Sequence, residues 1–177
     1  MNLKDLYEQC LHILRQRFPS LSAPYPTLTT TNRVGFLGCY TRSKNLISLN
    51  KQFVELNYLW EKSGVCHKQI VMDTILHELC HFVQFTMDAH SKHHGALFQS
   101  VARTMGVRPT ATTPGKMLER LKYRIRCPKC GASWYRHRLS KRMQRGHCGD
   151  CKEKLVVTEG SFVVEFDGEL GTAKEWE

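Results

Sequence analysis

Apolar residues recur at helical spacing in the N-terminal stretch, at Leu3, Leu6, Tyr7, Cys10, Leu11 and Leu14. Positions three and four apart share one face of a helix, so the pattern predicts an amphipathic first helix. Asp5 and Glu8 interrupt the stretch and no small-residue cleavage site follows, which is unlike a signal peptide. We therefore expect a cytoplasmic protein.

Short runs of β-branched and aromatic residues, separated by turn residues, follow this helix. Three of them, 27–33, 34–41 and 45–50, predict a small three-stranded sheet. A mostly buried helical pattern then runs from Lys68 to about Ala89, and a second one from Gly95 to Met105. Strand-like runs return within 156–166. Together these elements indicate an α+β fold.

Charge is unevenly distributed along the 177 residues, and no apolar run is long enough to span a membrane. Residues 116–154 hold 13 Lys and Arg against three acidic residues, whereas the rest of the chain holds 13 of each kind. Residues 155–177 hold six acids and one lysine. This asymmetry favours a polyanion partner for the basic segment, the alternative being a solvated basic surface. It also suggests three parts: a domain over 1–112, a basic module over 113–157 and an acidic tail over 158–177.

The helix that begins near Lys68 contains His77-Glu78-x-x-His81. Residues four apart lie on the same face of a helix, so His77 and His81 can direct ring nitrogens at one ion, with Glu78 beside it. Two imidazoles and a nearby carboxylate are what a zinc hydrolase needs. The alternative is a helix with two structural histidines.

A catalytic zinc usually has three protein ligands, so one more is needed. No acidic residue lies between Asp88 and Glu119, which leaves His90, His93 and His94. On a continued helix His90 would face the wrong side, and spacing does not decide between the other two. Asp73, one turn before His77, is either a partner that orients its ring or a surface aspartate.

Four cysteines, Cys127, Cys130, Cys148 and Cys151, form a C-x2-C-x17-C-x2-C pattern. Without an export signal, this spacing favours a closed, structural zinc site over disulfides, the alternative being a reactive dithiol. Gly131 and Gly149 suit the sharp turns that such a site requires. The isolated Cys10, Cys39, Cys66 and Cys80 are expected to be buried thiols. The sequence thus predicts two Zn²⁺ ions per chain, one catalytic and one structural.

Basic and aromatic residues surround and separate the cysteine pairs. Basic side chains neutralise phosphates and aromatic rings stack on unpaired bases, so we expect DNA, including single-stranded DNA, as a partner. The candidate contacts are Arg124, Arg126, Trp134, Tyr135, Arg136, Arg138, Lys141, Arg142 and Arg145. For Trp134 and Tyr135 the alternative is that they pack the interior of a small module.

His77-Glu78-x-x-His81 followed by His94-Gly95-x-x-Phe98 resembles the SprT family of zinc metallopeptidases, which includes the protease domain of eukaryotic Spartan. Ile47-Ser48-Leu49-Asn50 is similar to a strand end of that family, and the basic cysteine module also has a counterpart there. The resemblance implies a zincin-like core of helices on a three-stranded sheet, with a zinc ribbon after it. It also implies that His94 is the third ligand.

The activity expected from this resemblance is zinc-dependent hydrolysis of peptide bonds, with Glu78 as general base, in proteins associated with or crosslinked to DNA. The strand ending at Asn50 is expected to hold an extended substrate by strand addition. Two alternatives remain open: a DNA-binding zinc module with a vestigial protease site, and a general metallopeptidase with an incidental basic ribbon.

Overall fold

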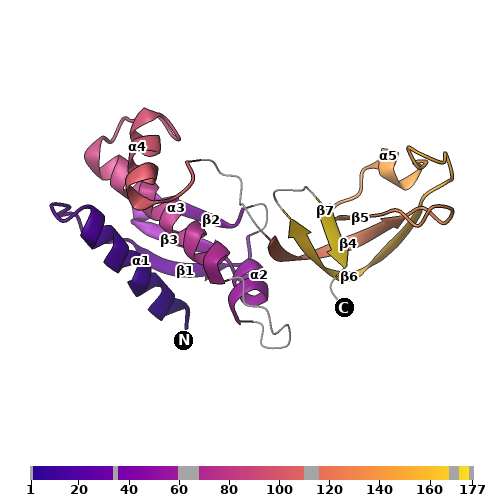
Figure 1. The fold of residues 1–177 in the computed structure, drawn as a ribbon, viewed down its shortest axis with the longest axis horizontal. Coiled ribbons are helices and arrows are strands. Elements are labelled where there is room, and N and C mark those ends of the chain that lie inside the picture. Colours follow the sequence, from indigo (N-terminus) through magenta and orange to yellow (C-terminus); the bar gives the residue numbers. More distant parts are fainter. Residues whose placement is uncertain (1, 34–35, 60–67, 110–115, 168–171, 176–177) are drawn as a thin grey trace. The chain divides into compact units, whose positions relative to one another are not determined.

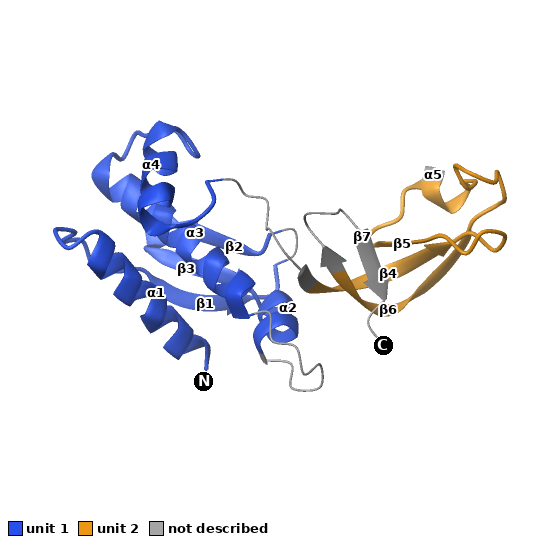
Figure 2. Cartoon of the chain, viewed as in Figure 1, with its two compact units in different colours: residues 1–114 blue, residues 115–177 orange. Residues whose placement is uncertain are grey.

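The computed structural model describes residues 2–33, 36–59, 68–109, 116–167 and 172–175. The chain divides into two compact units, residues 1–114 and 115–177 (Figure 2). Each unit has its own sheet.

The first unit combines helices with one small sheet (Figure 1). Its elements in chain order are α1 (Leu3–Arg17), β1 (Thr27–Thr31), β2 (Gly38–Thr41), the 3₁₀ turn η1 (Arg42–Lys44), β3 (Leu46–Asn50), α2 (Lys51–Val54), the π-helical turn η2 (Glu55–Leu59), α3 (Lys68–Met87) and α4 (Ala96–Met105). The helices and strands expected from the hydrophobic pattern are therefore present. Neither α2 nor η2 was expected.

The sheet has the strand order β1-β3-β2. β1 runs parallel to β3, with Thr27 opposite Leu46, and β2 runs antiparallel to it, with Gly38 opposite Leu49. Because β3 is paired on both sides, the strand that ends at Asn50 cannot accept another strand, and that expectation is wrong. Among the described strands, β2 is the edge strand that contacts α3.

Helix α3 lies at the centre of the unit and contacts α1, α4, β2 and β3. Leu14 of α1, Ile47 of β3 and Leu79 of α3 are all completely buried. α1 begins at a capping box in which Asn2 and Asp5 satisfy each other's backbone N–H groups, at 2.9 and 3.0 Å. Every catalytic candidate on α3 is thus attached to a core element.

Gly38 lets α3 approach the edge strand closely. A Cβ at this position would lie 2.8 Å from Cγ2 of Thr74 and 3.1 Å from Cγ of Glu78, both on α3. Any larger residue would have to push the helix or these side chains away. Glycine therefore sets the spacing between β2 and the helix turn that carries Glu78.

The second unit is an antiparallel sheet with the strand order β5-β4-β6-β7. Its elements are β4 (Lys116–Arg126), β5 (Ser133–Arg136), α5 (Lys141–Gln144), β6 (Val156–Asp167) and β7 (Thr172–Glu175). β4 pairs with β6 from Lys116 opposite Asp167 to Arg126 opposite Val156, with an irregularity between Leu121 and Tyr123. The sequence did not indicate β4, because basic residues interrupt its apolar positions.

Residues 158–167 continue strand β6 beyond the position where the sequence placed the start of an acidic tail. Val164 is completely buried there and clusters with Leu121, Tyr135 and Phe162. The physical reason is alternation along the strand: Phe162 and Val164 face the small core, whereas Glu165 follows at a position of the opposite face. Among the described residues, no helix is long and apolar enough to cross a bilayer.

Candidate metal centres

Three imidazole rings converge where α3 meets the start of α4. Nε2 of His94 lies 3.2 Å from Nε2 of His77 and 3.0 Å from Nε2 of His81. His77 and His81 occupy one face of α3, and His94 is two residues before α4. The three nitrogens form a group that could hold a metal ion.

The loop before α4 has an unusual backbone conformation that positions His94 next to the helix histidines. His94 has a left-handed φ of 54°. Gly95 follows, and a Cβ there would lie 2.8 Å from the carbonyl oxygen of Lys92, so only glycine fits this turn. Phe98, completely buried in the first turn of α4, lies against all three rings, with centroid distances of 4.3 to 5.0 Å.

The other two histidine candidates lie differently. His93 is exposed, and its ring stacks on that of His81 with centroids 4.2 Å apart and planes 19° apart. His90 is exposed as well, and its backbone N–H binds the carboxylate of Asp88. Of the two histidines that spacing left open, His93 and His94, it is His94 whose nitrogen lies next to those of the helix histidines.

Burial keeps the helix histidines neutral. It lowers the pKa of His77 to about 4 and that of His81 to about 3, with the neighbouring histidines adding to the effect. The pKa of His94 is lowered for the same reasons. A neutral imidazole offers a free lone pair, which is the form that ligates a metal.

The donor set fits zinc. With zinc–nitrogen bonds of about 2.0–2.1 Å, neighbouring nitrogens of a tetrahedral site lie about 3.3 Å apart. The observed 3.0 and 3.2 Å are close to this spacing. Three nitrogens leave one position of a tetrahedron for substrate or water, as catalytic rather than structural zinc sites do.

Glu78 is buried beside the histidines and is held by the edge strand. Its Oε2 accepts a hydrogen bond of 2.7 Å from the backbone N–H of Tyr40 in β2. Burial raises the pKa of Glu78 to about 7, although the Tyr40 N–H opposes the shift. Among the described residues, its other oxygen has no hydrogen-bond partner and is not fully buried. This oxygen can therefore exchange protons at neutral pH.

Sequence reasoning missed three contributors to this site: Tyr40, which acts through its main chain, the spacer Gly38, and the buried Gln84. Oε1 of Gln84 lies 3.2 Å from Nδ1 of His81. Asp73, considered as a partner for His77, instead accepts a hydrogen bond from Gln69 at 2.7 Å.

The four cysteines form the second group that could hold a metal ion. Sγ of Cys127 lies 3.3 Å from that of Cys151, and Sγ of Cys130 lies 3.7 Å from that of Cys148. Zinc–sulfur bonds of about 2.3 Å place the sulfurs of a tetrahedral site about 3.8 Å apart, so this donor set also fits zinc. Four thiolates close the coordination shell, which is typical of a structural site.

The two cysteine pairs sit in matching turns. In the first, the N–H of Gly131 binds the carbonyl of Cys127 at 3.0 Å, and in the second the N–H of Lys152 binds that of Cys148 at 3.1 Å. Gly131 and Lys152 have φ of 78° and 59°. The left-handed positions are thus Gly131 and Lys152. Gly149, expected at a sharp turn, has no positive φ.

The candidate nucleic-acid residues differ in exposure. The exposed ones are Arg126, Arg136, Arg138, Lys141 and Arg145, and Trp134 is partly exposed. Arg124 is half-buried, with its guanidinium over the ring of Phe162 at 5.1 Å. Tyr135 is 6% exposed within the small core, so its ring packs the ribbon and is not available to stack on a base. The side chain of Arg142 lies outside the described residues.

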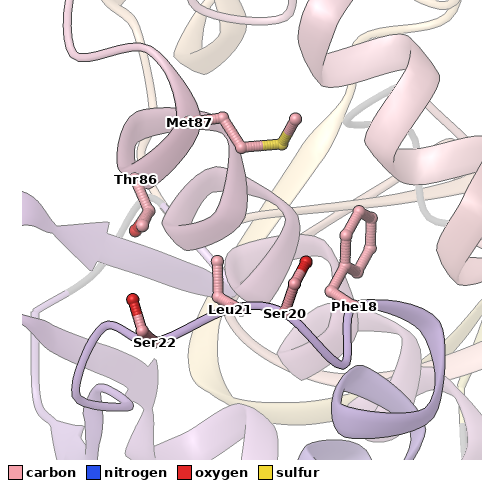
Figure 3. Close-up of a pocket in the computed structure, with 6 residues that line it drawn as sticks. All are labelled: Phe18, Ser20, Leu21, Ser22, Thr86 and Met87. Carbon is pink, nitrogen blue, oxygen red and sulfur yellow. The ribbon is translucent and has the colours of Figure 1, made fainter.

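A hollow of about 250 Å³ lies between the end of α1 and the end of α3 (Figure 3). Phe18, Leu21 and Met87 line it, together with three hydroxyl residues, Ser20, Ser22 and Thr86. No side chain in this lining titrates near neutral pH, and none is a candidate site residue. The hollow therefore offers no catalytic chemistry.

Comparisons with known proteins agree with the geometry. The model of the SprT-like family matches residues 4–117. A curated relative, "Protein SprT-like" of Staphylococcus carnosus (strain TM300), is 30% identical over 131 residues, which cover 73% of this chain and 76% of the relative. No solved structure matches the chain.

Proposed function

The chain belongs to the SprT-like family, and from this premise we propose that it is a zinc-dependent metalloprotease that cleaves DNA-associated or DNA-crosslinked proteins. The observation that carries the proposal is the convergence of three imidazole nitrogens. Those of His77 and His81 lie within 3.2 Å of His94 Nε2, next to the buried Glu78 on the helix that carries the first two. His77, His81 and His94 would hold the catalytic zinc. The four ribbon cysteines would hold a structural one.

A Zn²⁺ ion in this site would supply Lewis acidity, which polarises a carbonyl and makes water more acidic. Glu78 would do the proton transfer. Its unpaired carboxylate oxygen takes a proton from the attacking water and passes it to the nitrogen of the leaving amine. The Tyr40 N–H holds the other oxygen, which fixes the orientation of the carboxylate.

The substrate would lie along β2. This strand pairs only with β3 among the described strands, so its other edge, apart from the Tyr40 N–H that Glu78 uses, could form main-chain hydrogen bonds with an extended peptide. β2 also carries the N–H that fixes Glu78. A peptide on this edge would therefore be positioned by the same strand that positions the base.

The basic ribbon would bind DNA. Five of its candidate arginines and lysines are exposed, and Trp134 shares a sheet face with Tyr123 and Arg136, as their strand pairing shows. Cations and partly exposed aromatic rings on one surface suit a flexible phosphate backbone with unpaired bases. Binding through the ribbon would raise the concentration of bound protein near the protease unit.

Cleavage of a DNA-bound protein tests the protease assignment. The zinc-loaded chain should cleave it, and Glu78→Gln should remove cleavage while DNA affinity stays unchanged. If Glu78→Gln cleaves as fast as the parent, Glu78 is not the base. If the parent cleaves nothing but binds DNA, the chain is a DNA-binding zinc module instead.

A charge variant tests the role of the ribbon. The variant changes Arg136, Arg138 and Lys141 to Gln. When the logarithm of affinity for single-stranded DNA is plotted against the logarithm of salt concentration, its slope should be shallower by about 2, because each phosphate contact contributes about 0.7. Cleavage of a short peptide should not change. The matched control changes three exposed basic residues of the first unit, Lys4, Arg17 and Lys44, to Gln. Equal slopes for both variants would remove the ribbon from the proposal.

A further inference from the structure

Gln84 is completely buried on α3, three residues after His81. A buried amide is costly unless its hydrogen-bonding groups are paired. Gln84 has a partner for each of them: Nε2 donates to Oγ of Ser91 at 3.1 Å and to the carbonyl of Lys92 at 2.8 Å, and Oε1 faces Nδ1 of His81 at 3.2 Å. It therefore connects the metal-facing helix to the loop that precedes His94.

These partners fix the orientation of the amide. The carbonyl of Lys92 can only accept, so the nitrogen of Gln84 must face it. The oxygen of Gln84 then faces His81, and because this oxygen can only accept, Nδ1 of His81 must carry the proton. The lone pair of His81 is left on Nε2, the nitrogen that faces His94. One backbone carbonyl thus determines which nitrogen of His81 is free to ligate.

The same amide holds the loop that delivers His94. The Lys92 carbonyl also accepts the N–H of Gly95 at 2.8 Å, which closes the turn around His94. The hydroxyl of Ser91 donates to the carbonyl of Asp88 at 2.8 Å while accepting from Gln84. Both donors of Gln84 therefore act on residues within three positions of His94.

We propose that Gln84 is a positioning residue for two ligands at once. It sets the tautomer of His81 and the position of His94, so that both present a free nitrogen lone pair to the same metal ion. The inference rests on the proposed metal centre. A partner behind a ligating histidine typically changes metal affinity about 10- to 100-fold. Gln84 contacts one ligand and also the loop of another. Its removal should therefore lower metal affinity by a factor near the upper end of this range.

Zinc affinity of the full chain, measured by competition with a chelator, is the first test. Gln84→Met keeps the size of the side chain and removes its hydrogen bonds, and zinc at the histidine site should bind about 100-fold more weakly while the ribbon zinc remains. Gln99→Met, an exposed position on α4, is the matched control and should bind as the parent does. Equal affinity of folded Gln84→Met and parent overturns the proposal.

The tautomer gives a second readout that does not depend on metal. Nitrogen NMR of the histidine rings, with the histidine site empty and the ribbon loaded, should show His81 protonated on Nδ1 in the parent and a mixture in Gln84→Met. Gln84→Glu still accepts from His81 but cannot donate to the loop. It should therefore keep the parent tautomer and still lose affinity.

Ser91→Ala tests the same contact between Gln84 and the loop if Gln84→Met does not fold. It removes one loop contact and should weaken zinc binding about two- to tenfold, the effect of one neutral hydrogen bond. Unchanged affinity in Ser91→Ala then overturns the proposal. If the parent itself holds only the ribbon zinc, the proposed metal centre fails, and the ring spectra still report on Gln84.

Discussion

Gly38→Ala should displace α3 from β2 and so separate the base from the strand that orients it. The added methyl would lie 2.8 Å from Cγ2 of Thr74 and 3.1 Å from Cγ of Glu78. Carbon atoms prefer separations of about 3.5–4.0 Å, so the helix or these side chains must move by several tenths of an ångström. The 2.7 Å bond from Tyr40 to Glu78 is the contact most directly affected.

Overpacking of this kind costs about 1–3 kcal/mol in the free energy of unfolding. Where φ is not positive, replacing glycine with alanine also stabilises the folded state by about 0.4–1 kcal/mol, because the unfolded chain has less conformational entropy. The net loss should be about 1–2 kcal/mol, which lowers the melting temperature by about 4–8 °C. Because a 1 Å misplacement can cost about 100-fold, a shift of several tenths should lower kcat/KM about tenfold.

Thermal melts that follow the helical circular dichroism signal report on the first unit, since its helices are the long ones. Thr74→Ser is the partner variant: it removes the methyl that clashes and keeps the hydroxyl, which bonds the carbonyl of Ile70 at 2.8 Å. Alone it should cost about 1 kcal/mol. Combined with Gly38→Ala it should recover about 1 kcal/mol of the loss.

Gly149→Ala is the matched control, because a Cβ there would have no neighbour within 4 Å and φ is not positive. It should leave both melting temperature and cleavage unchanged. Additive losses in the Gly38/Thr74 double variant, or a Gly38→Ala chain as stable and active as the parent, would refute the spacing argument.

Three further predictions concern metal and thiols. Elemental analysis should find two zinc ions per chain and one in His81→Ala; a single zinc in the parent contradicts one of the two centres. His94→Ala should lose the exchangeable zinc while His93→Ala keeps it, and the reverse would move the third ligand by one residue. Burial raises the pKa of Cys10 and Cys80 to about 12, so iodoacetamide should label neither in the native chain at neutral pH and both after unfolding, as mass spectrometry can show.

The local chemistry of this protein could be predicted from sequence because it depends on short spacing. His77 and His81 share a helix face by periodicity, and the two cysteine pairs form matching turns by their own backbone geometry. The long helices follow from apolar periodicity in the same way. Each of these features involves residues within about one or two turns of each other.

Pairing between strands could not be predicted in this way. β3 is central, between β1 and β2, which contradicts the strand addition expected at the strand ending at Asn50. Strand β6 incorporates residues that composition alone placed in an acidic tail, because β4 offers it a partner over its full length. Composition describes side chains, whereas sheet order depends on main-chain hydrogen bonds between distant segments.

The sequence by itself determined the two kinds of donor set, and its spacing left His93 and His94 open as the third ligand. Only the tertiary structure brought His94 to the helix pair, through a left-handed backbone, a glycine turn and the amide of Gln84. Only the tertiary structure showed that the Tyr40 N–H donates to Glu78, a residue 38 positions later in the chain. The physical reason is that orientation of a ligand or a base depends on hydrogen bonds from neighbours in space, and a backbone N–H or a carbonyl has no signature in the sequence.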